Sequence, residues 1–193
     1  MPACVQATMK QDKMTTNFLD SLFASMYNNS LKKTPVIIKQ MIINYIINYP
    51  EYYGIVADWY MTHWGSNYPE RTHADWIAYI GKNTDKIPIT IIAIEQKQES
   101  LIPIGTASLR LGDLEQYNPN TAWLSGVYVT PPHRGKGIGT ALIKEIIKIA
   151  NKKFDALYLF TRTDGRIYKN LGWEMIDEIE QPSEKVSVMM RFL

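Results

Sequence analysis

Three alternate glycines, Gly135, Gly137 and Gly139, stand in a short loop between an apolar strand and an amphipathic helix. Arg134 and Lys136 lie among them and add positive charge. Glycine lets the backbone approach a ligand closely, and the first N–H groups of a helix have no partner within it. Together with the helix dipole, these groups form an anion site that suits phosphate. The stretch therefore predicts a cradle for a pyrophosphate.

The spacing of the loop excludes two common nucleotide cradles. The P-loop requires Gly-x-x-x-x-Gly-Lys followed by Ser or Thr, a string that does not occur in the chain. The Rossmann fingerprint requires a third Gly or Ala, but registers that start at Gly135 or Gly137 place Thr140 or Leu142 there. What is left is Arg134, two intervening residues and then Gly-x-Gly at Gly137 and Gly139, soon after a Val-Tyr-Val strand.

This arrangement resembles the acetyl-CoA signature of the GNAT superfamily of N-acetyltransferases, in which Gln or Arg is followed by x-x-Gly-x and then Gly or Ala. Downstream, Tyr168-Lys-Asn-Leu-Gly-Trp173 resembles the Tyr-x-x-x-Gly-aromatic element near the end of GNAT domains. The alternative for the loop alone is a glycine turn before an ordinary helix. The preceding strand, Arg134, and the second signature favour a bacterial-type GNAT acetyltransferase, with the resemblance covering about residues 36–193.

The resemblance implies that acetyl-CoA is a co-substrate. Its pyrophosphate would lie on the loop, and its thioester beside a strand that splays from its neighbour and frees N–H groups for an oxyanion hole. Thr161 stands where many members have an Asn that holds the pantetheine arm. The expected cofactor-binding residues are Val127, Tyr128, Val129, Arg134, Gly135, Lys136, Gly137, Ile138, Gly139, Thr140 and Thr161.

The same resemblance implies that Tyr168 protonates the departing CoA thiolate or hydrogen-bonds to it. A thiol has a pKa of about 8.5 and a phenol a pKa of about 10, so the two can share a proton. The alternative is a helix tyrosine with its ring packed inward and its hydroxyl at the rim. The expected reaction is direct attack of an amine on the thioester, and Cys4, in a stretch without periodicity, is a poor candidate for a nucleophile.

The sequence leaves the proton acceptor open. An ammonium cannot attack a thioester, and a lysine-like amine has a pKa of about 10.4, so a base or a chain of waters is needed. Many GNAT enzymes carry a glutamate on the motif strand, whereas this chain has Trp-Leu-Ser-Gly there. The candidates in its place are Asp113, Glu115, Ser125 and His133, of which His133 is expected at the rim of the pyrophosphate loop.

Three functions are compatible with these residues. The favoured one is N-acetylation of a primary amine on a small molecule such as a polyamine, an amino sugar or an antibiotic. The alternatives are acetylation of a protein or peptide, and a non-catalytic acetyl-CoA-binding module that acts through its N-terminal helix. Aromatic residues between 59 and 76 line either a substrate pocket or the helix cores.

Composition narrows the class of protein. The chain has 193 residues, 46% of them hydrophobic and 21% charged, as in a globular domain. The net charge of +2 gives no reason to expect nucleic acid. There is no apolar run of about 20 residues for a membrane helix and no signal-peptide core, so we expect a soluble, cytoplasmic protein.

His63 and His73 lack partners at zinc spacing, so no metal is expected. A homodimer is expected only because GNAT dimers are common.

Hydrophobic periodicity gives the element order. Residues 1–35 are predicted to be a tail with one short amphipathic helix, and residues 36–193 the GNAT domain. Strands are predicted at residues 36–43, 87–95, 102–111, 123–129, 156–161, 173–179 and 186–193, and helices at 50–63, from after 67 to 80, 137–153 and 166–172. The order β-α-α-β-β-β-α-β-α-β-β predicts an α/β fold of the mixed α+β kind: a mostly antiparallel sheet, one parallel pair at the motif strand, and flanking helices.

Overall fold

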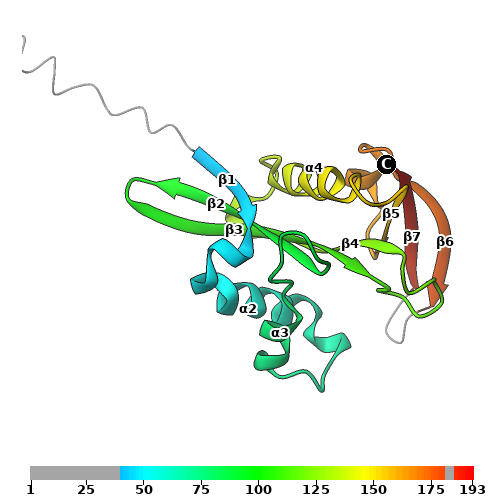
Figure 1. The fold of residues 1–193 in the computed structure, drawn as a ribbon, viewed down its shortest axis with the longest axis horizontal. Helices are drawn as coiled ribbons and strands as arrows, with labels where there is room; N and C mark the ends of the chain where they lie inside the picture. The colour runs from blue at the N-terminus through cyan, green and yellow to red at the C-terminus, as the bar shows by residue number, and fades with distance from the viewer. Residues whose placement is uncertain (1–39, 181–184) are drawn as a thin grey trace, which may run out of the picture. The chain divides into compact units, whose positions relative to one another are not determined.

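The computed structural model describes residues 40–180 and 185–193. The predicted tail and N-terminal helix, residues 1–35, lie outside the described residues, so the domain boundary at residue 36 stays a prediction. The described residues contain a seven-stranded sheet in the order β1-β2-β3-β4-β5-β7-β6 (Figure 1). Its strands are β1 (Gln40–Tyr45), β2 (Ile89–Lys97), β3 (Ser100–Leu111), β4 (Ala122–Val129), β5 (Ala156–Thr161), β6 (Glu174–Glu180) and β7 (Lys185–Phe192).

The sheet is mixed in the predicted way. β4 and β5 pair in parallel, and every other neighbouring pair is antiparallel. A parallel pair needs a long crossover, which helix α4 (Ile138–Ala150) supplies between these two strands. The predicted fold class and element order are therefore confirmed. The first strand ends at Tyr45 rather than at residue 43, and its predicted start at residues 36–39 lies outside the described residues.

Helices cover both faces of the sheet. α4 lies on one face, and α2 (Tyr53–Trp64) and α3 (His73–Tyr79) lie on the other (Figure 1). Helix α5 (Arg166–Lys169) follows β5. Short 3-10 helices are formed by Ile46–Asn48, Pro50–Tyr52, Gly65–Asn67 and Pro131–His133. A hydrophobic core lies on each face of the sheet, and alternate β2 residues pack into the two cores. Ile91 packs in the core under α4, and Ile92 packs in the core under α2 and α3.

The amphipathic pattern of α4 was predicted correctly. Five apolar positions predicted to form one stripe are all buried, and Lys144 and Lys148 on the opposite face are exposed. The helix ends at Ala150 rather than at residue 153, so the exposed Lys152 lies beyond it. The predicted buried residues are Ile138, Leu142, Ile146, Ile149 and Ala150. This burial fixes how the helix N-terminus, and therefore the glycine loop, is presented beside β4.

The inward face predicted for α2 was partly wrong. The apolar spacing of residues 50–63 predicts an inward face that contains Ile55, Trp59 and Val56, but 38% of Ile55 is exposed. Val56 is buried as predicted, and its buried neighbours are Ala57 and Tyr60, because residues at i, i+1 and i+4 share one face of a helix. Several aromatic residues allow more than one such face, so the α2 sequence alone does not decide its rotation.

The second predicted helix begins later than expected. α3 starts at His73 rather than directly after residue 67. Thr72 is its N-cap: the Asp75 N–H donates to the Thr72 hydroxyl at 3.2 Å, and the Thr72 N–H donates to the Asp75 carboxylate at 2.8 Å. This capping box satisfies N–H groups at the helix start. Its hydrogen bonds to Thr72 also lower the pKa of Asp75.

A β-bulge interrupts β4 one residue after Ser125. Thr106 pairs with Tyr128 and Ser108 with Ser125, so two β4 residues, Gly126 and Val127, oppose one residue of β3. Gly126 has a φ of +59°, and a Cβ built on it would lie 2.7 Å from the Tyr60 hydroxyl oxygen. Only glycine satisfies both conditions. The bulge re-aims the end of the strand toward the glycine loop.

We therefore expect Gly126→Ala to destabilise the protein by about 2 kcal/mol or more, because alanine is strained at positive φ and would press on Tyr60. Urea unfolding followed by circular dichroism measures the change. Gly54→Ala is the matched control, since nothing lies within 4 Å of a Cβ at Gly54 and alanine is favoured in a helix. Equal stability of the two variants would contradict the role of the bulge.

Candidate active site

The glycine loop presents an uncapped helix N-terminus. Gly135 and Gly137 have φ values of +72° and +79°, and a Cβ on either would meet nothing within 4 Å. Gly137 is the N-cap of α4, with no side-chain hydrogen bond to the first turn and no acidic residue in it. Residues 134–137 of the loop are exposed, whereas Ile138, the first residue of α4, is buried. The first-turn N–H groups therefore face open space, as an anion site requires.

The two cations of the loop help to shape it. The Arg134 Nε donates to the Val129 carbonyl at 3.0 Å, and its guanidinium lies 3.4 Å from His63 Nε2. The Lys136 ammonium donates to the Pro132 carbonyl at 2.7 Å. Burial and, second, the Arg134 charge lower the pKa of His63. Both cations thus keep positive charge at the loop, and Arg134 ties it to the end of β4 while Lys136 ties it to the Pro131–His133 turn.

Gly139 is the point where three elements meet. A Cβ built on it would lie 3.5 Å from Ile167 Cδ1 on α5 and 3.7 Å from Val129 Cγ2 on β4. Val127, Val129 and Tyr168 pack against the same core as the α4 residues. The structure thus brings the motif strand, the glycine loop and the Tyr168 helix together, although the first and last lie about forty residues apart.

The parallel pairing of β4 with β5 is short. Within the described residues, Trp123 with Tyr158 is the register pair between them. Beyond it, β4 continues to Val129 while paired with β3 on its other side. Strand N–H groups alternate in direction along an antiparallel ladder, so those of residues 125–129 that point away from β3 have no β5 partner among the described residues. The expected splay is present at the end of β4.

Tyr168 is held on α5 by a turn that explains the Tyr-x-x-x-Gly spacing. Gly172 has a φ of +81°, and this turn lets the Trp173 N–H donate back to the Tyr168 carbonyl at 3.1 Å. The Tyr168 and Trp173 rings then pack edge to face, 6.1 Å apart. Burial raises the pKa of Tyr168, so its hydroxyl stays protonated at neutral pH.

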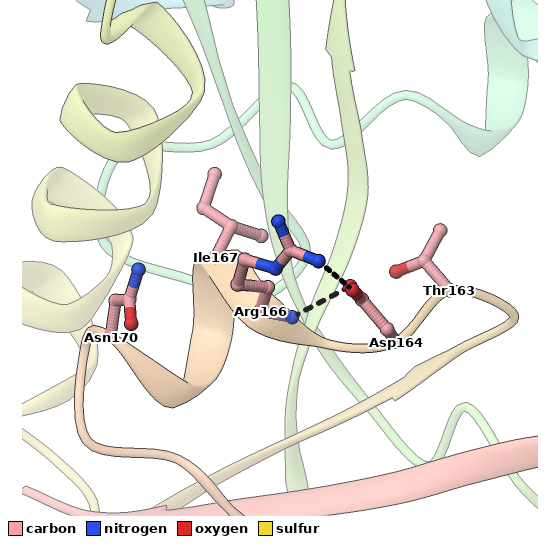
Figure 2. A pocket seen from close by; sticks show the side chains of 5 residues that line it. All are labelled: Thr163, Asp164, Arg166, Ile167 and Asn170. Carbon is pink, nitrogen blue, oxygen red and sulfur yellow. Dashed lines mark hydrogen bonds and ion pairs between the residues drawn. The ribbon is translucent and has the colours of Figure 1, made fainter.

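A shallow cavity of about 510 Å³ opens beside α5. Figure 2 shows its lining residues on α5, at the C-cap of α5 and on the loop that precedes it. The Arg166 guanidinium lies 3.0 Å from the Asp164 carboxylate. Ile167 belongs both to this cavity and to the contact with Gly139, so the cavity adjoins the first turn of α4. The lining residues are Thr163, Asp164, Arg166, Ile167 and Asn170.

Thr161 is the last residue of β5, where the loop to α5 begins. Its hydroxyl lies 3.0 Å from the Thr163 hydroxyl and accepts a hydrogen bond from the Thr163 N–H at 3.2 Å. The side chain is therefore engaged in a local turn. It lies on the strand that faces the open end of β4, as the predicted role requires.

The four candidate proton acceptors lie in different places. Asp113 accepts a hydrogen bond from Ser125 on β4, so these two candidates are in contact. Glu115 is exposed on the same loop. His133 lies between the Thr130 hydroxyl, 2.8 Å from Nδ1, and the buried Glu95 carboxylate, 3.3 Å from Nε2.

The His133–Glu95 pair was missed from the sequence. Glu95 lies in an apolar β2 run, and nothing local indicates that a loop residue 38 positions later reaches it. The charged residue inside a buried strand was the available signal, since such a residue requires a partner. The pair anchors the Pro131–His133 turn, from which the glycine loop starts.

An aromatic wall flanks the end of β4 on the α2 side. The Tyr128 ring lies 5.0 Å from that of Trp59 and 4.7 Å from that of His63. Trp76 is buried in the helix core instead.

Across the described residues no group of three or more His, Cys, Asp or Glu side chains is arranged to hold a metal, and no helix there is both long and apolar enough to cross a membrane.

Comparison with known families agrees with this geometry. Residues 54–173 match the acetyltransferase (GNAT) family, a span that includes the glycine loop, the bulged strand and Tyr168. The chain therefore belongs to the GNAT family of acetyltransferases. No curated protein matches it closely enough to count as a relative.

Solved structures show the same fold at low sequence identity. Arabidopsis thaliana NAA60, in complex with acetyl-CoA, matches with a TM-score of 0.62 and 14% identity over 80% of this chain and 99% of that one. yncA from Salmonella typhimurium, with its cofactor acetyl-CoA, has a TM-score of 0.61 and 18% identity, covering 79% and 94%. An aminoglycoside 6'-N-acetyltransferase complexed with coenzyme A has a TM-score of 0.57 and 18% identity, covering 78% and 96%. At these identities the likeness shows the GNAT fold.

Proposed function

We propose that the chain is an acetyl-CoA-dependent N-acetyltransferase that transfers an acetyl group to a primary amine of a small molecule by direct attack. The observation that carries the proposal is the junction at Gly139. There the open N-terminus of α4, the free end of β4 and the helix of Tyr168 lie in contact. Family membership and the acetyl-CoA named with two structural neighbours support the same co-substrate.

The residues present fit acetyl-CoA. The first-turn amides of Ile138, Gly139 and Thr140 would hold the pyrophosphate, because no side chain caps them and no Cβ stands in front of Gly135 or Gly137. Arg134 and Lys136 add positive charge there. The N–H groups at residues 127–129 would hold the pantetheine arm and polarise the thioester carbonyl. Thr161 would meet the arm from β5.

The cavity beside α5 suits the adenosine end of the co-substrate. It adjoins the α4 first turn through Ile167 and contains one cation, Arg166, paired with Asp164 at its exposed edge. A guanidinium binds phosphate well. Arg166 would therefore exchange part of its pairing with Asp164 for the 3'-phosphate.

Tyr168 is proposed to donate the proton that the departing thiolate needs. Tyr168 packs in the core between α4 and the sheet, so it lies on the side of β4 that α4 covers. Its raised pKa keeps the proton on the hydroxyl until a thiolate forms. The aromatic wall of Trp59, His63 and Tyr128 lies on the opposite side and would receive the acceptor amine. One of the solved structures with a similar fold is an aminoglycoside 6'-N-acetyltransferase, and this agrees with a small-molecule acceptor.

Calorimetry with acetyl-CoA and thiol release across an amine panel test the proposal together. The panel contains spermidine, kanamycin, a peptide with a free α-amino group and a peptide with a lysine side chain. We expect acetyl-CoA binding and the fastest thiol release with a small amine. Fastest release with a peptide would overturn the small-molecule acceptor. Tight binding without turnover on any amine would support a non-catalytic acetyl-CoA-binding module instead.

A further inference from the structure

Asp113 is a nearly buried carboxylate that the proposed function has not used. It follows β3 at the positive-φ residue Gly112, and 12% of its side chain is exposed. Its carboxylate accepts a hydrogen bond from the Ser125 hydroxyl. Ser125 stands on β4 directly before the bulge at Gly126 and two residues before Val127. At about 3.3 Å per strand residue, the hydroxyl is within about 7 Å, along the strand, of the expected thioester site.

Ser125 belongs to a row of hydroxyls that crosses three strands. Thr90 on β2 pairs with Ser108 on β3, which pairs with Ser125 on β4. The Ser108 hydroxyl lies 2.8 Å from that of Thr90 and 3.0 Å from that of Tyr60. The Tyr60 hydroxyl in turn lies against Gly126. Polar side chains at this depth need hydrogen-bond partners, and this row supplies them at the level of the bulge.

The charged and titratable groups around Asp113 come from each neighbouring element. Arg110 on β3 lies 3.5 Å from the carboxylate and stacks on the ring of Tyr79 from α3. Arg71, before α3, and Tyr60, on α2, also interact electrostatically with it. Burial is the largest influence and raises the pKa of Asp113 to about 6, although Arg110 and Arg71 oppose it. The group is therefore ionised at neutral pH and more basic than an ordinary aspartate.

We propose that Asp113, through the Ser125 hydroxyl, accepts the proton that the acceptor ammonium must lose before it attacks the thioester. This inference rests on the proposed function. Ser125 gives its proton to Asp113 and takes one from the ammonium, so the serine is unchanged and a neutral amine is formed. The amine nitrogen then bonds to the thioester carbon, and the carbon–sulfur bond breaks. The second nitrogen proton replaces the one that Tyr168 gives to the thiolate, and Asp113 loses its proton to solvent.

The positions of Tyr168 and of the Asp113–Ser125 pair agree with their separate roles as proton donor and proton acceptor. Tyr168 packs in the core on the α4 face, whereas Asp113 interacts electrostatically with Tyr60 and Tyr79 of the opposite face and accepts a hydrogen bond from Ser125. The leaving thiolate and the entering amine would therefore meet their partners on opposite sides of β4. Of the other candidates, Glu115 is exposed and His133 is engaged by Thr130 and Glu95.

The test is the pH profile of kcat/KM between pH 5 and 9, with the panel amine that gives the fastest thiol release. We expect the wild-type value to rise through a pKa near 6 and then level. Asp113→Asn should lower it about a hundred- to a thousand-fold at pH 7. Its remaining rate should climb with pH in step with the free-amine fraction, so that the gap to wild type closes. Ser125→Ala should act in the same direction, and Asp113→Glu should restore part of the rate.

The controls separate this inference from a structural effect and from the proposed function. Glu115→Gln removes an acid from the same loop and should leave the profile unchanged. Calorimetry should give the same acetyl-CoA affinity for Asp113→Asn as for wild type. An Asp113→Asn protein that binds acetyl-CoA and keeps the wild-type profile would overturn the role of Asp113 alone. Absence of turnover in the wild type would instead reject the proposed enzyme.

Discussion

Replacing Tyr168 with phenylalanine should lower kcat about a hundred- to a thousand-fold at neutral pH and leave the affinity for acetyl-CoA unchanged. The substitution removes one oxygen and keeps the ring that packs 6.1 Å from Trp173. Among the residues that the structure describes, none hydrogen-bonds to the Tyr168 hydroxyl, so its loss breaks no contact within the fold. The effect should therefore fall on departure of the thiolate. Steady-state thiol release and calorimetry measure the two quantities.

Tyr158→Phe is the matched control for this experiment. Tyr158 lies on β5 and packs on Tyr117 and Trp123, in a cluster separate from that of Tyr168. Its variant should retain wild-type kcat. A Tyr168→Phe enzyme as fast as wild type would reject the acid role and leave solvent to protonate the thiolate. A loss of acetyl-CoA affinity would show that the hydroxyl holds the co-substrate instead.

Patterns that depend on local geometry were predicted from the sequence. The buried face of α4 was predicted correctly because a long helix on a sheet must bury one face. The parallel pair followed from the crossover that α4 makes between two strands. The spacing from Tyr168 to Gly172 has a local cause as well, because a positive-φ residue is needed where α5 turns into β6.

Features that depend on distant partners were not predicted. The inward face of α2 is set by Tyr60, whose hydroxyl meets Ser108 across the sheet, and no local pattern favours that face over the one that contains Ile55. Gly126, in the bulge, lies against the same Tyr60 hydroxyl, which its local sequence does not indicate. Asp113 was a candidate base from the sequence, but its contact with Ser125 arises only when the loop after β3 folds onto β4.

Gly137→Val should weaken acetyl-CoA binding about 100-fold. Gly137 is the N-cap of α4 at a φ of +79°, where a β-branched residue is strongly disfavoured. Holding a non-glycine residue there costs about 1–3 kcal/mol, and about 2.7 kcal/mol corresponds to a hundredfold change in Kd. The loop is expected to relax to a negative φ, which would turn the first-turn amides away from the pyrophosphate. Calorimetric titration with coenzyme A measures the loss.

Comparison with the neighbouring glycines distinguishes the backbone effect from simple obstruction. A Cβ at Gly137 would meet no protein atom within 4 Å, whereas at Gly139 it would touch Ile167 and Val129. Gly137→Ala, which adds strain with little bulk, should therefore lose much of the affinity that Gly137→Val loses. Gly139→Ala has no positive φ to maintain and should lose less. The opposite result, in which Gly137→Ala binds coenzyme A as tightly as wild type and Gly139→Ala does not, would contradict this explanation. Binding of the pyrophosphate would then depend on the space around Gly139 rather than on the conformation of the N-cap.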